Sequence, residues 1–215
     1  MIDRKDVISV NTELSLAKAI DRMNLFGHRA LPVVNMGRYF GVIDMDAIYQ
    51  HLYVRKDVDL DVAVVSDVMR DNIQIVFASE FVERAAVAFY NQRYQFVPVL
   101  MDGTTDQFLG IIPISTIMDI FASTLGLNQT AHRITCEVYD YRGELAKLTR
   151  ALMQSGANIT SFATVLYKEG NDQNATPRIR LVMKFEGDLE QGLAAVRAQG
   201  ARVTHIDRYE GDRQS

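Results

Sequence analysis

The residues of this chain best suited to chemistry lie in two short segments that each begin with a glycine and two apolar residues. They are Gly41–Ala47 (GVIDMDA) and Gly110–Thr116 (GIIPIST). Both are predicted to leave a strand and enter a helix, whose first N–H groups are unpaired. The hydroxyls of Ser115 and Thr116 suit a bound phosphate there. Asp44 and Asp46 would repel a phosphate, and each instead stabilises its helix N-terminus by about 0.3–1 kcal/mol.

No other pattern in the sequence predicts catalysis. Phosphate-binding and dinucleotide-binding glycine loops are absent from the sequence, as are the motifs of zinc proteases and serine hydrolases. The histidines do not pair at metal-ligand spacing; they are His28, His51, His132 and His205. Asp57–Asp61 is interpreted either as a cation loop or as a solvated linker, and it lacks the glycine and glutamate of a calcium loop. We predict a protein that is not an enzyme and has neither a catalytic cofactor nor a metal site.

Composition narrows the class of protein. The chain has 215 residues, of which 48% are hydrophobic and 23% charged, which excludes a largely disordered chain. A net charge of -4, with no basic run, argues against binding to nucleic acid. The single cysteine, Cys136, excludes a disulfide within the chain and is predicted to be buried. The charged N-terminus and the polar residues within Phe108–Leu127 predict a cytoplasmic protein with no signal peptide and no contact with a membrane.

An internal repeat organises the first 127 residues. Thr12–Val34 aligns with Ala78–Leu100 at an offset of 66, so that the Leu-Pro-Val at Leu31 falls on the Val-Pro-Val at Val97. Gly41-Val42-Ile43 aligns with Gly110-Ile111-Ile112 at an offset of 69. The added residues fall in a turn-rich segment, where insertions cost little.

Each repeat is predicted to have the order β-α-β-β-α. Apolar residues at helical spacing follow a short strand, and Thr12 and Ser79 are the predicted N-caps. Two strands follow, and a last helix is predicted to begin near Met45 in the first repeat. In the second repeat it begins at or just after Pro113, where the missing N–H costs nothing.

The doubled pattern resembles a pair of CBS domains, predicted at residues 1–62 and 63–127. Val65–Met69 (VSDVM) resembles the lead-in to such a domain. The resemblance implies a sensor that binds an adenosine nucleotide (AMP, ADP or ATP) or S-adenosylmethionine as a regulatory ligand. The family pattern has Thr or Ser, and three residues later Asp, after its Gly and two apolar residues. Here Asp44 and Ala47 take those places in the first repeat, and Pro113 and Thr116 take them in the second.

The resemblance also implies which residues meet the ligand, in the cleft between the repeats. Backbone around two strand starts would hold the base: Ala30, Leu31 and Pro32 in the first repeat, and Phe96, Val97 and Pro98 in the second. Ser115 and Thr116 would meet a phosphate, and Asp44 a ribose hydroxyl.

A second module is predicted at residues 132–208, after a linker at Leu127–Thr130. Its expected elements are strands at Ile134–Asp140, Ser161–Lys168, Ile179–Phe185 and Val203–Ile206, helices at Glu144–Gln154 and after Asp188, and a polar loop at Gly170–Pro177. The order β-α-β-β-α-β is that of a ferredoxin-like fold, so the whole chain is predicted to be α+β.

Two segments of this module resemble an ACT domain, namely Asp140–Ala146 (DYRGELA) and Gly156–Ile159 (GANI). The resemblance implies an amino-acid site, often at a dimer contact, formed by Arg142, Gly143, Glu144, Asn158 and Ile159. Arg142 takes the place of a proline usual in that family. The alternative is that Gly143 serves a tight turn and Asn158 a strand entry. The CBS pair followed by an ACT domain resembles the AcuB-type acetoin-utilisation proteins.

Four hypotheses about the function of the chain remain. The first is a regulator whose ligands change the shape of a homodimer and thereby affect a regulated enzyme. The others are a dimeric scaffold with empty sites, an enzyme of unrecognised type, and an RNA-binding protein using the second module's sheet, which lacks the needed exposed aromatics. A homodimer is predicted because the helix Ile114–Leu125 carries more apolar residues than a small sheet can cover.

Overall fold

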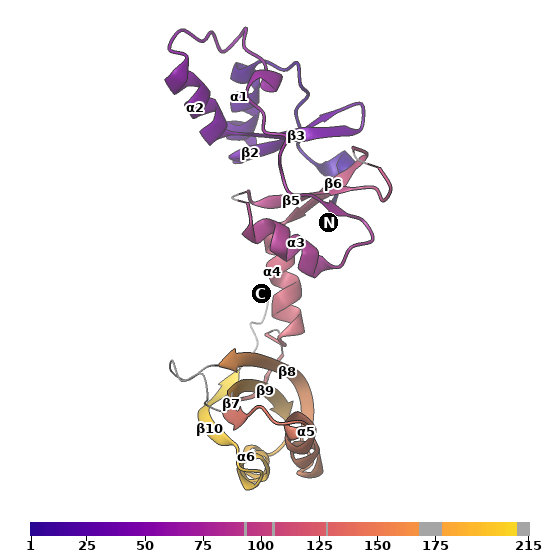
Figure 1. The fold of residues 1–215 in the computed structure, drawn as a ribbon, viewed down its shortest axis with the longest axis vertical. Coiled ribbons are helices and arrows are strands. Elements are labelled where there is room, and N and C mark those ends of the chain that lie inside the picture. Colours follow the sequence, from indigo (N-terminus) through magenta and orange to yellow (C-terminus); the bar gives the residue numbers. More distant parts are fainter. Residues whose placement is uncertain (93, 105, 128, 168–177, 210–215) are drawn as a thin grey trace. The chain divides into compact units, whose positions relative to one another are not determined.

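The computed structural model describes residues 1–92, 94–104, 106–127, 129–167 and 178–209. The chain forms two compact units, Met1–Met118 and Asp119–Ser215, shown in Figure 1. The first repeat falls within the first unit, as does the second repeat up to the middle of its last helix. Among the described residues, no helix is long and apolar enough to cross a membrane.

The first unit confirms the doubled element order. Its elements are β1 (Ile2–Asp3), the 3-10 turn η1 (Arg4–Asp6), α1 (Leu16–Phe26), β2 (Ala30–Asn35), β3 (Arg38–Asp44), α2 (Met45–Val54), the 3-10 turn η2 (Val65–Asp67), β4 (Val76–Phe77), α3 (Val82–Tyr90), β5 (Phe96–Leu100), β6 (Phe108–Pro113) and the beginning of α4 (Ile114–Thr124). Helices α1 and α3, like strands β2 and β5, start 66 residues apart, as the aligned repeats predict. The last helices start at Met45 and Ile114, also as predicted.

Both predicted N-caps of the first helices are wrong. Helix α1 begins at Leu16, and Ser15 is its cap because its hydroxyl accepts from the Lys18 N–H at 3.4 Å. Thr12 instead lies in a turn, where its carbonyl accepts from the Ser66 N–H at 3.0 Å.

In the second repeat the cap position is Phe81, which has no side-chain cap bond. The Ser79 hydroxyl instead donates to Asp102 at 2.6 Å. The Ser79 hydroxyl is therefore engaged by a distant segment and does not cap α3.

The segments that lead into the repeats each pair with the other repeat. Strand β1, which precedes the first repeat, pairs with β6 of the second, with Asp3 opposite Gly110. Arg70, which precedes the second repeat, exchanges two backbone hydrogen bonds with Val42 of β3, at 2.8 and 2.9 Å. The resulting sheets have the orders β1-β6-β5-β4 and β2-β3. The two repeats are thus joined along both lead-in segments and form one folded body.

The core of the first repeat lies between α1, α2 and strands β2 and β3. Its fully buried members include Leu16, Met23, Val33, Ile43 and Ile48. Tyr39 of β3 stacks on Phe108 of β6 with ring centroids 5.8 Å apart, which adds an aromatic contact between the repeats.

The second unit has the predicted β-α-β-β-α-β order. Its elements are the end of α4, then β7 (Ala131–Tyr139), α5 (Glu144–Gln154), β8 (Asn158–Tyr167), β9 (Arg178–Glu186), α6 (Leu189–Ala198) and β10 (Arg202–Tyr209). The four strands form an antiparallel sheet in the order β10-β7-β9-β8. The predicted loop Gly170–Pro177, and the end of the strand predicted to reach Lys168, lie outside the described residues.

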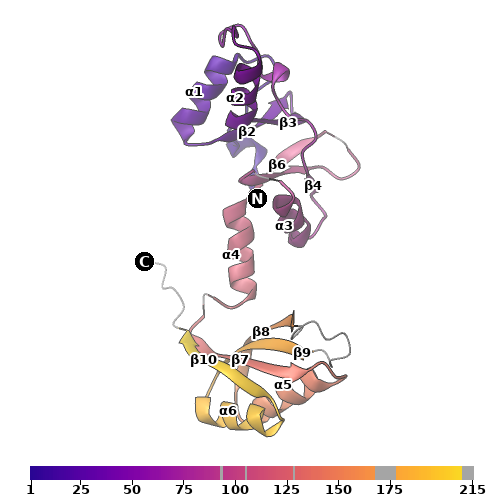
Figure 2. The same cartoon turned by 60° about the vertical axis from the view of Figure 1, so that its left-hand side comes forward.

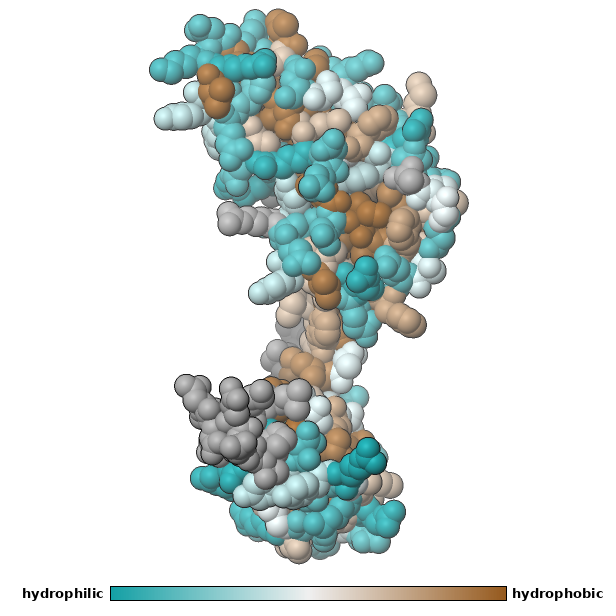
Figure 3. Space-filling model, viewed as in Figure 1, coloured by the Kyte–Doolittle hydropathy of each residue, from teal (hydrophilic) through white to brown (hydrophobic). Residues whose placement is uncertain are grey.

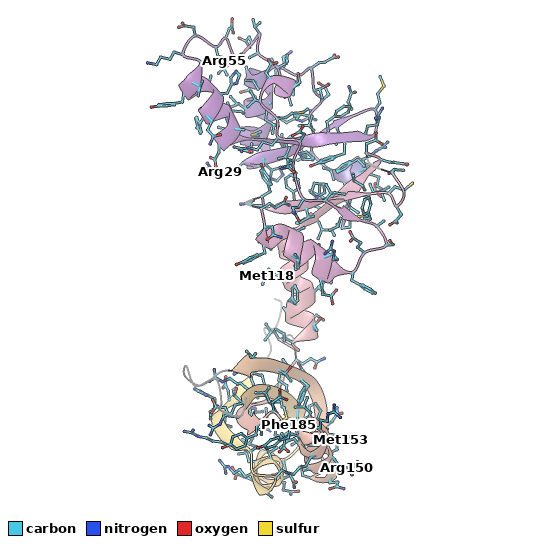
Figure 4. The ribbon with its side chains drawn as sticks, in the orientation of Figure 1. Arg29, Arg55, Met118, Arg150, Met153 and Phe185 are labelled. Atoms are coloured by element: carbon cyan, nitrogen blue, oxygen red, sulfur yellow. The ribbon has the colours of Figure 1, made fainter. Side chains whose placement is uncertain are left out.

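Helices α5 and α6 cover one face of this sheet (Figure 2). Phe185 is fully buried at the centre of that layer (Figure 4), where Gly192 of α6 leaves room for its ring. Cys136 is fully buried in the same core, as predicted, and burial raises the pKa of its thiol to about 11.

The opposite face of the sheet carries a buried lysine. The Lys184 side chain is 2% exposed, and its Nζ donates to the carbonyl of Gly126, just beyond α4, at 2.8 Å. Ser161 of β8 donates to the Thr124 carbonyl at 3.4 Å. Lys184 and Ser161 therefore attach the end of α4 to this face of the sheet.

We predict that Gly110→Ala destabilises the first unit by more than about 3 kcal/mol. A Cβ at Gly110 would lie well inside van der Waals contact of the Ile2 carbonyl oxygen, so the β1–β6 pairing must open. Gly103→Ala is the matched control, since its Cβ meets no atom within 4 Å and only the positive φ is strained. Urea unfolding measures both, and the control should cost about 1–2 kcal/mol. An equal loss of stability in the two variants would contradict a close contact between Gly110 and the Ile2 carbonyl in the β1–β6 pairing.

Candidate functional site

The first unit contains a cavity of about 850 Å³ between the two repeats. Its walls come from the starts of β2 and β5, the ends of β3 and β6, the first turn of α2 and the two lead-in segments. The volume lies within the usual range for small-molecule sites, about 300–1,000 Å³. Equivalent ends of the paired strands meet there because the repeats have the same internal order.

Five of the predicted site residues line this cavity. They are Ala30, Leu31, Pro32, Asp44 and Phe96.

Four other predicted residues are described by the structure but do not line it. Val97 is fully buried in the core, whereas the preceding residue, Phe96, lines the cavity. Pro98, the next residue of β5, is not part of the wall. Ser115 and Thr116 lie in the first turn of α4, away from the cavity wall.

Asp44 is the most constrained polar group of the cavity. Asp44 is only 7% exposed, and its carboxylate accepts three hydrogen bonds. Oδ1 accepts from the Ala47 N–H at 2.7 Å and so caps α2. Oδ2 accepts from Arg70 Nε at 3.1 Å and from the Tyr94 hydroxyl at 3.0 Å. Both oxygens of the predicted ribose contact are therefore already engaged.

The Tyr94 and Arg70 side chains are both hydrogen-bonded to this carboxylate. Burial, and then the charge of Asp44, raise the pKa of Tyr94 to about 12, so the hydroxyl remains a donor at neutral pH. Arg70 also donates from Nη2 to Gln50 of α2 at 3.2 Å. The three side chains connect α2 and the segment before the second repeat to the loop before β5.

The rim of the cavity carries a weaker ion pair. Arg29 and Asp46 lie 3.8 Å apart, with side chains 74% and 77% exposed, so the pair contributes little. Figure 4 shows Arg29 at the N-terminal end of α2 and Arg55 at its other end.

Comparison with known protein families identifies the family to which the first unit belongs. The family model of the CBS domain matches residues 2–53 and 65–123, more than half of the chain. The chain belongs to the CBS-domain family. CBS domains are in general regulatory, nucleotide-sensing modules. A comparison with curated proteins found no match.

Solved CBS structures resemble the chain over its CBS pair. CbpB from Streptococcus agalactiae aligns with a TM-score of 0.52 at 19% identity, covering 58% of this chain and 78% of that one. A hypothetical conserved protein from Geobacillus kaustophilus aligns with a TM-score of 0.51 at 22% identity, covering 58% and 94%. A CBS domain-containing protein from Bacillus anthracis has a TM-score of 0.50 at 20% identity, covering 57% and 89%. At these identities the likeness shows the shared fold alone.

Several residues of the CBS cavity were missed by sequence reasoning. Besides Arg70 and Tyr94, amide side chains from three segments line the wall: Gln50, Asn72, Gln74, Asn91, Gln92 and Gln95. The signal that could have found some of them is the polar run just before the Val-Pro-Val strand, at the position where the first repeat has His28 and Arg29.

The residues predicted to form an amino-acid site do not converge within one chain. Arg142, Gly143 and Glu144 stand at the N-terminal end of α5, whereas Asn158 and Ile159 follow its C-terminal end. The helix has 11 residues, which corresponds to about 16 Å.

Local contacts account for some of these residues separately. Glu144 pairs with Lys147 at 3.4 Å, and Asn158 donates to Glu186 at 3.3 Å. Gly143 has a φ of 86°, as the tight-turn alternative requires. A single site from both groups needs two copies of the chain.

Among the described residues, no group of three or more His, Cys, Asp or Glu side chains could hold a metal ion. Asp59 of the acidic run accepts from the Asp61 N–H at 2.9 Å, which is a local turn.

We predict that Asp44→Ala destabilises the CBS pair by about 2–4 kcal/mol, because it removes the cap of α2 and leaves Arg70 without its ion-pair partner. Asp46→Ala is the matched control, because Asp46 is exposed and lies two residues further along, and it should change stability by less than about 1 kcal/mol. Chemical denaturation of both variants measures the difference. A similar small loss for both would show that the Asp44 network contributes nothing to folding.

Proposed function

We propose that this protein is a non-catalytic, dimeric, ligand-sensing regulator whose CBS pair binds an adenosine nucleotide or S-adenosylmethionine. The observation that carries the proposal is the cavity of about 850 Å³, which both repeats line and which includes five of the nine residues that the family resemblance implies. Leu31, Pro32 and Phe96 offer apolar surface for the base, and the surrounding amides offer donors and acceptors for its edge.

The aromatic part of the wall supports this ligand class. Tyr94 and Phe96 lie with ring centroids 6.4 Å apart, and both line the cavity. A planar base gains contact area and stacking from such rings. The ribose would meet the Asp44 side of the cavity, where it has to compete with the bonds from Arg70 and Tyr94.

A thermal-shift screen with AMP, ADP, ATP, adenosine and S-adenosylmethionine tests this proposal. A ligand present at about 100 times its Kd stabilises the folded chain by about 2.7 kcal/mol, which is a shift of several degrees in Tm. Ala30→Phe, which places a ring in the cavity, should abolish the shift. Ala198→Phe, on an exposed position of α6, should retain it. The absence of any shift, checked by calorimetry at millimolar ligand, would overturn the proposed binding.

The second unit is proposed to be an ACT domain that binds an amino acid or a related carboxylate. Backbone N–H groups at the start of α5, with Arg142, would face the carboxylate, and Asn158 of a second copy would meet the other polar end. The separation of these residues along α5 supports a site shared by two chains.

The homodimer that such a site requires is proposed to form partly through α4. Met118 of this helix is 56% exposed and Leu125, which directly follows its last residue, is 41% exposed, although Ile117 is buried. Figure 3 shows apolar side chains at the surface along α4. A second copy would cover them.

Mixing two variants tests the shared site. Gly143→Val and Asn158→Ala chains should each fail to bind the amino acid that the wild type binds in calorimetry. Equal mixing should restore about one quarter of the sites, because half of the dimers are mixed and each holds one intact site. Light scattering must first give the mass of a dimer. Binding by either variant alone, or no recovery on mixing, would contradict the arrangement.

A scaffold with empty sites is the second candidate function. The observation that favours it is the occupied state of Asp44, whose three bonds give it a structural role without a ligand. The screen above separates the two functions, since a scaffold shows no shift with any of the five compounds.

A further inference from the structure

The N-terminus of α2, which faces the CBS cavity, is closed to phosphate by its own side chains. The Asp44 carboxylate occupies the Ala47 N–H at 2.7 Å, and Asp46 lies in the same first turn. An anion bound at a helix N-terminus needs free N–H groups and no competing negative charge. Here the Ala47 and Met45 N–H groups already have partners, and two carboxylates lie at the same helix end.

The corresponding position in the second repeat is also partly closed. Pro113 precedes α4 and has no N–H, and the Ile114 N–H donates to the Gln95 carbonyl at 2.9 Å. Ser115 and Thr116, the hydroxyls that would contact a phosphate, do not line the cavity.

Both guanidinium groups in the described part of the wall already have carboxylate partners. Arg70 pairs with Asp44 at 3.1 Å and Arg29 with Asp46 at 3.8 Å. Asp6 adds a third carboxylate, so carboxylates outnumber guanidiniums in this part of the lining. A phosphate would have to displace an existing pair and approach uncompensated negative charge.

Uncharged polar groups make up much of the remaining wall. Asn72, Asn91 and Gln95 bring amides that donate and accept without net charge. Such groups can satisfy the hydroxyls and ring nitrogens of a nucleoside, and they give no preference to an anion.

We propose that the CBS cavity selects adenosine ligands that carry no phosphate, either neutral or positively charged at the 5′ position, and discriminates against AMP, ADP and ATP. This inference rests on the proposed function and specifies the ligand class of that site. Asp46 is the specificity-determining residue, because it is exposed on the cavity rim and its charge is only weakly neutralised by Arg29. S-adenosylmethionine, with its sulfonium, represents the positively charged class and adenosine the neutral class.

Calorimetry on the full chain at low salt compares adenosine, S-adenosylmethionine, AMP and ATP. We expect AMP to bind at least about tenfold more weakly than adenosine, with ATP weaker still and S-adenosylmethionine no weaker than adenosine. The difference between adenosine and AMP should shrink as sodium chloride screens the carboxylates.

Two variants test whether Asp46 causes the selectivity against AMP. Asp46→Asn should raise the affinity for AMP relative to the affinity for adenosine. Asp21→Asn is the matched control, since Asp21 is an exposed residue of α1 outside the cavity lining, and the selectivity should stay as in the wild type.

The outcomes separate this inference from the proposed function. AMP or ATP binding as tightly as adenosine, or tighter, would overturn the selectivity and leave the proposed function standing. Selectivity that persists unchanged in Asp46→Asn would overturn the role of Asp46. If none of the four compounds binds, the proposed function fails and the inference fails with it.

Discussion

The carboxylate of Asp44 is the interaction on which the CBS pair depends most. It accepts hydrogen bonds from the first turn of α2, from Arg70 in the segment between the repeats, and from Tyr94 in the second repeat. A buried carboxylate is stable only when such donors replace water. One side chain therefore fixes the start of a helix, the path of the connecting segment and the wall of the cavity at once.

The same carboxylate changes what the cavity can recognise. A hydroxyl at this position would leave the helix N-terminus available to an anion, which is what the family pattern implies. Asp44 uses that position for the protein's own stability, and the neighbouring Asp46 adds further negative charge. The stability of the fold and the choice of ligand are thus linked through one turn of α2.

Most of the fold could be predicted from the sequence, because the first unit contains an internal sequence repeat. The offsets of 66 and 69 residues placed the strands and last helices of both repeats, and the apolar spacing placed α5 and α6 in the second unit. The N-caps could not be found in the same way. Thr12 and Ser79 are good capping residues, but Ser66 and Asp102, both distant in sequence, engage them.

The candidate site was only partly predictable for a similar reason. The strand starts at Ala30 and Phe96 follow from the repeat, whereas Arg70 reaches the cavity only because its segment crosses to β3 of the first repeat. Val97 was assigned to the site together with Phe96, but its side chain is fully buried in the core and does not line the cavity. In the second unit, the resemblance grouped Gly143 with Asn158, and the length of α5 separates them within one chain.

Hydrogen–deuterium exchange of the full chain, with and without saturating adenosine or S-adenosylmethionine, tests the central claim most directly. The account predicts slower exchange in the segments that line the cavity, namely residues 28–32, 44–50 and 94–96. The sheet of the second unit should be unaffected at its core strands. Protection confined to the second unit, or no change anywhere at saturating ligand, would contradict the claim that the cavity of the CBS pair is the sensing site.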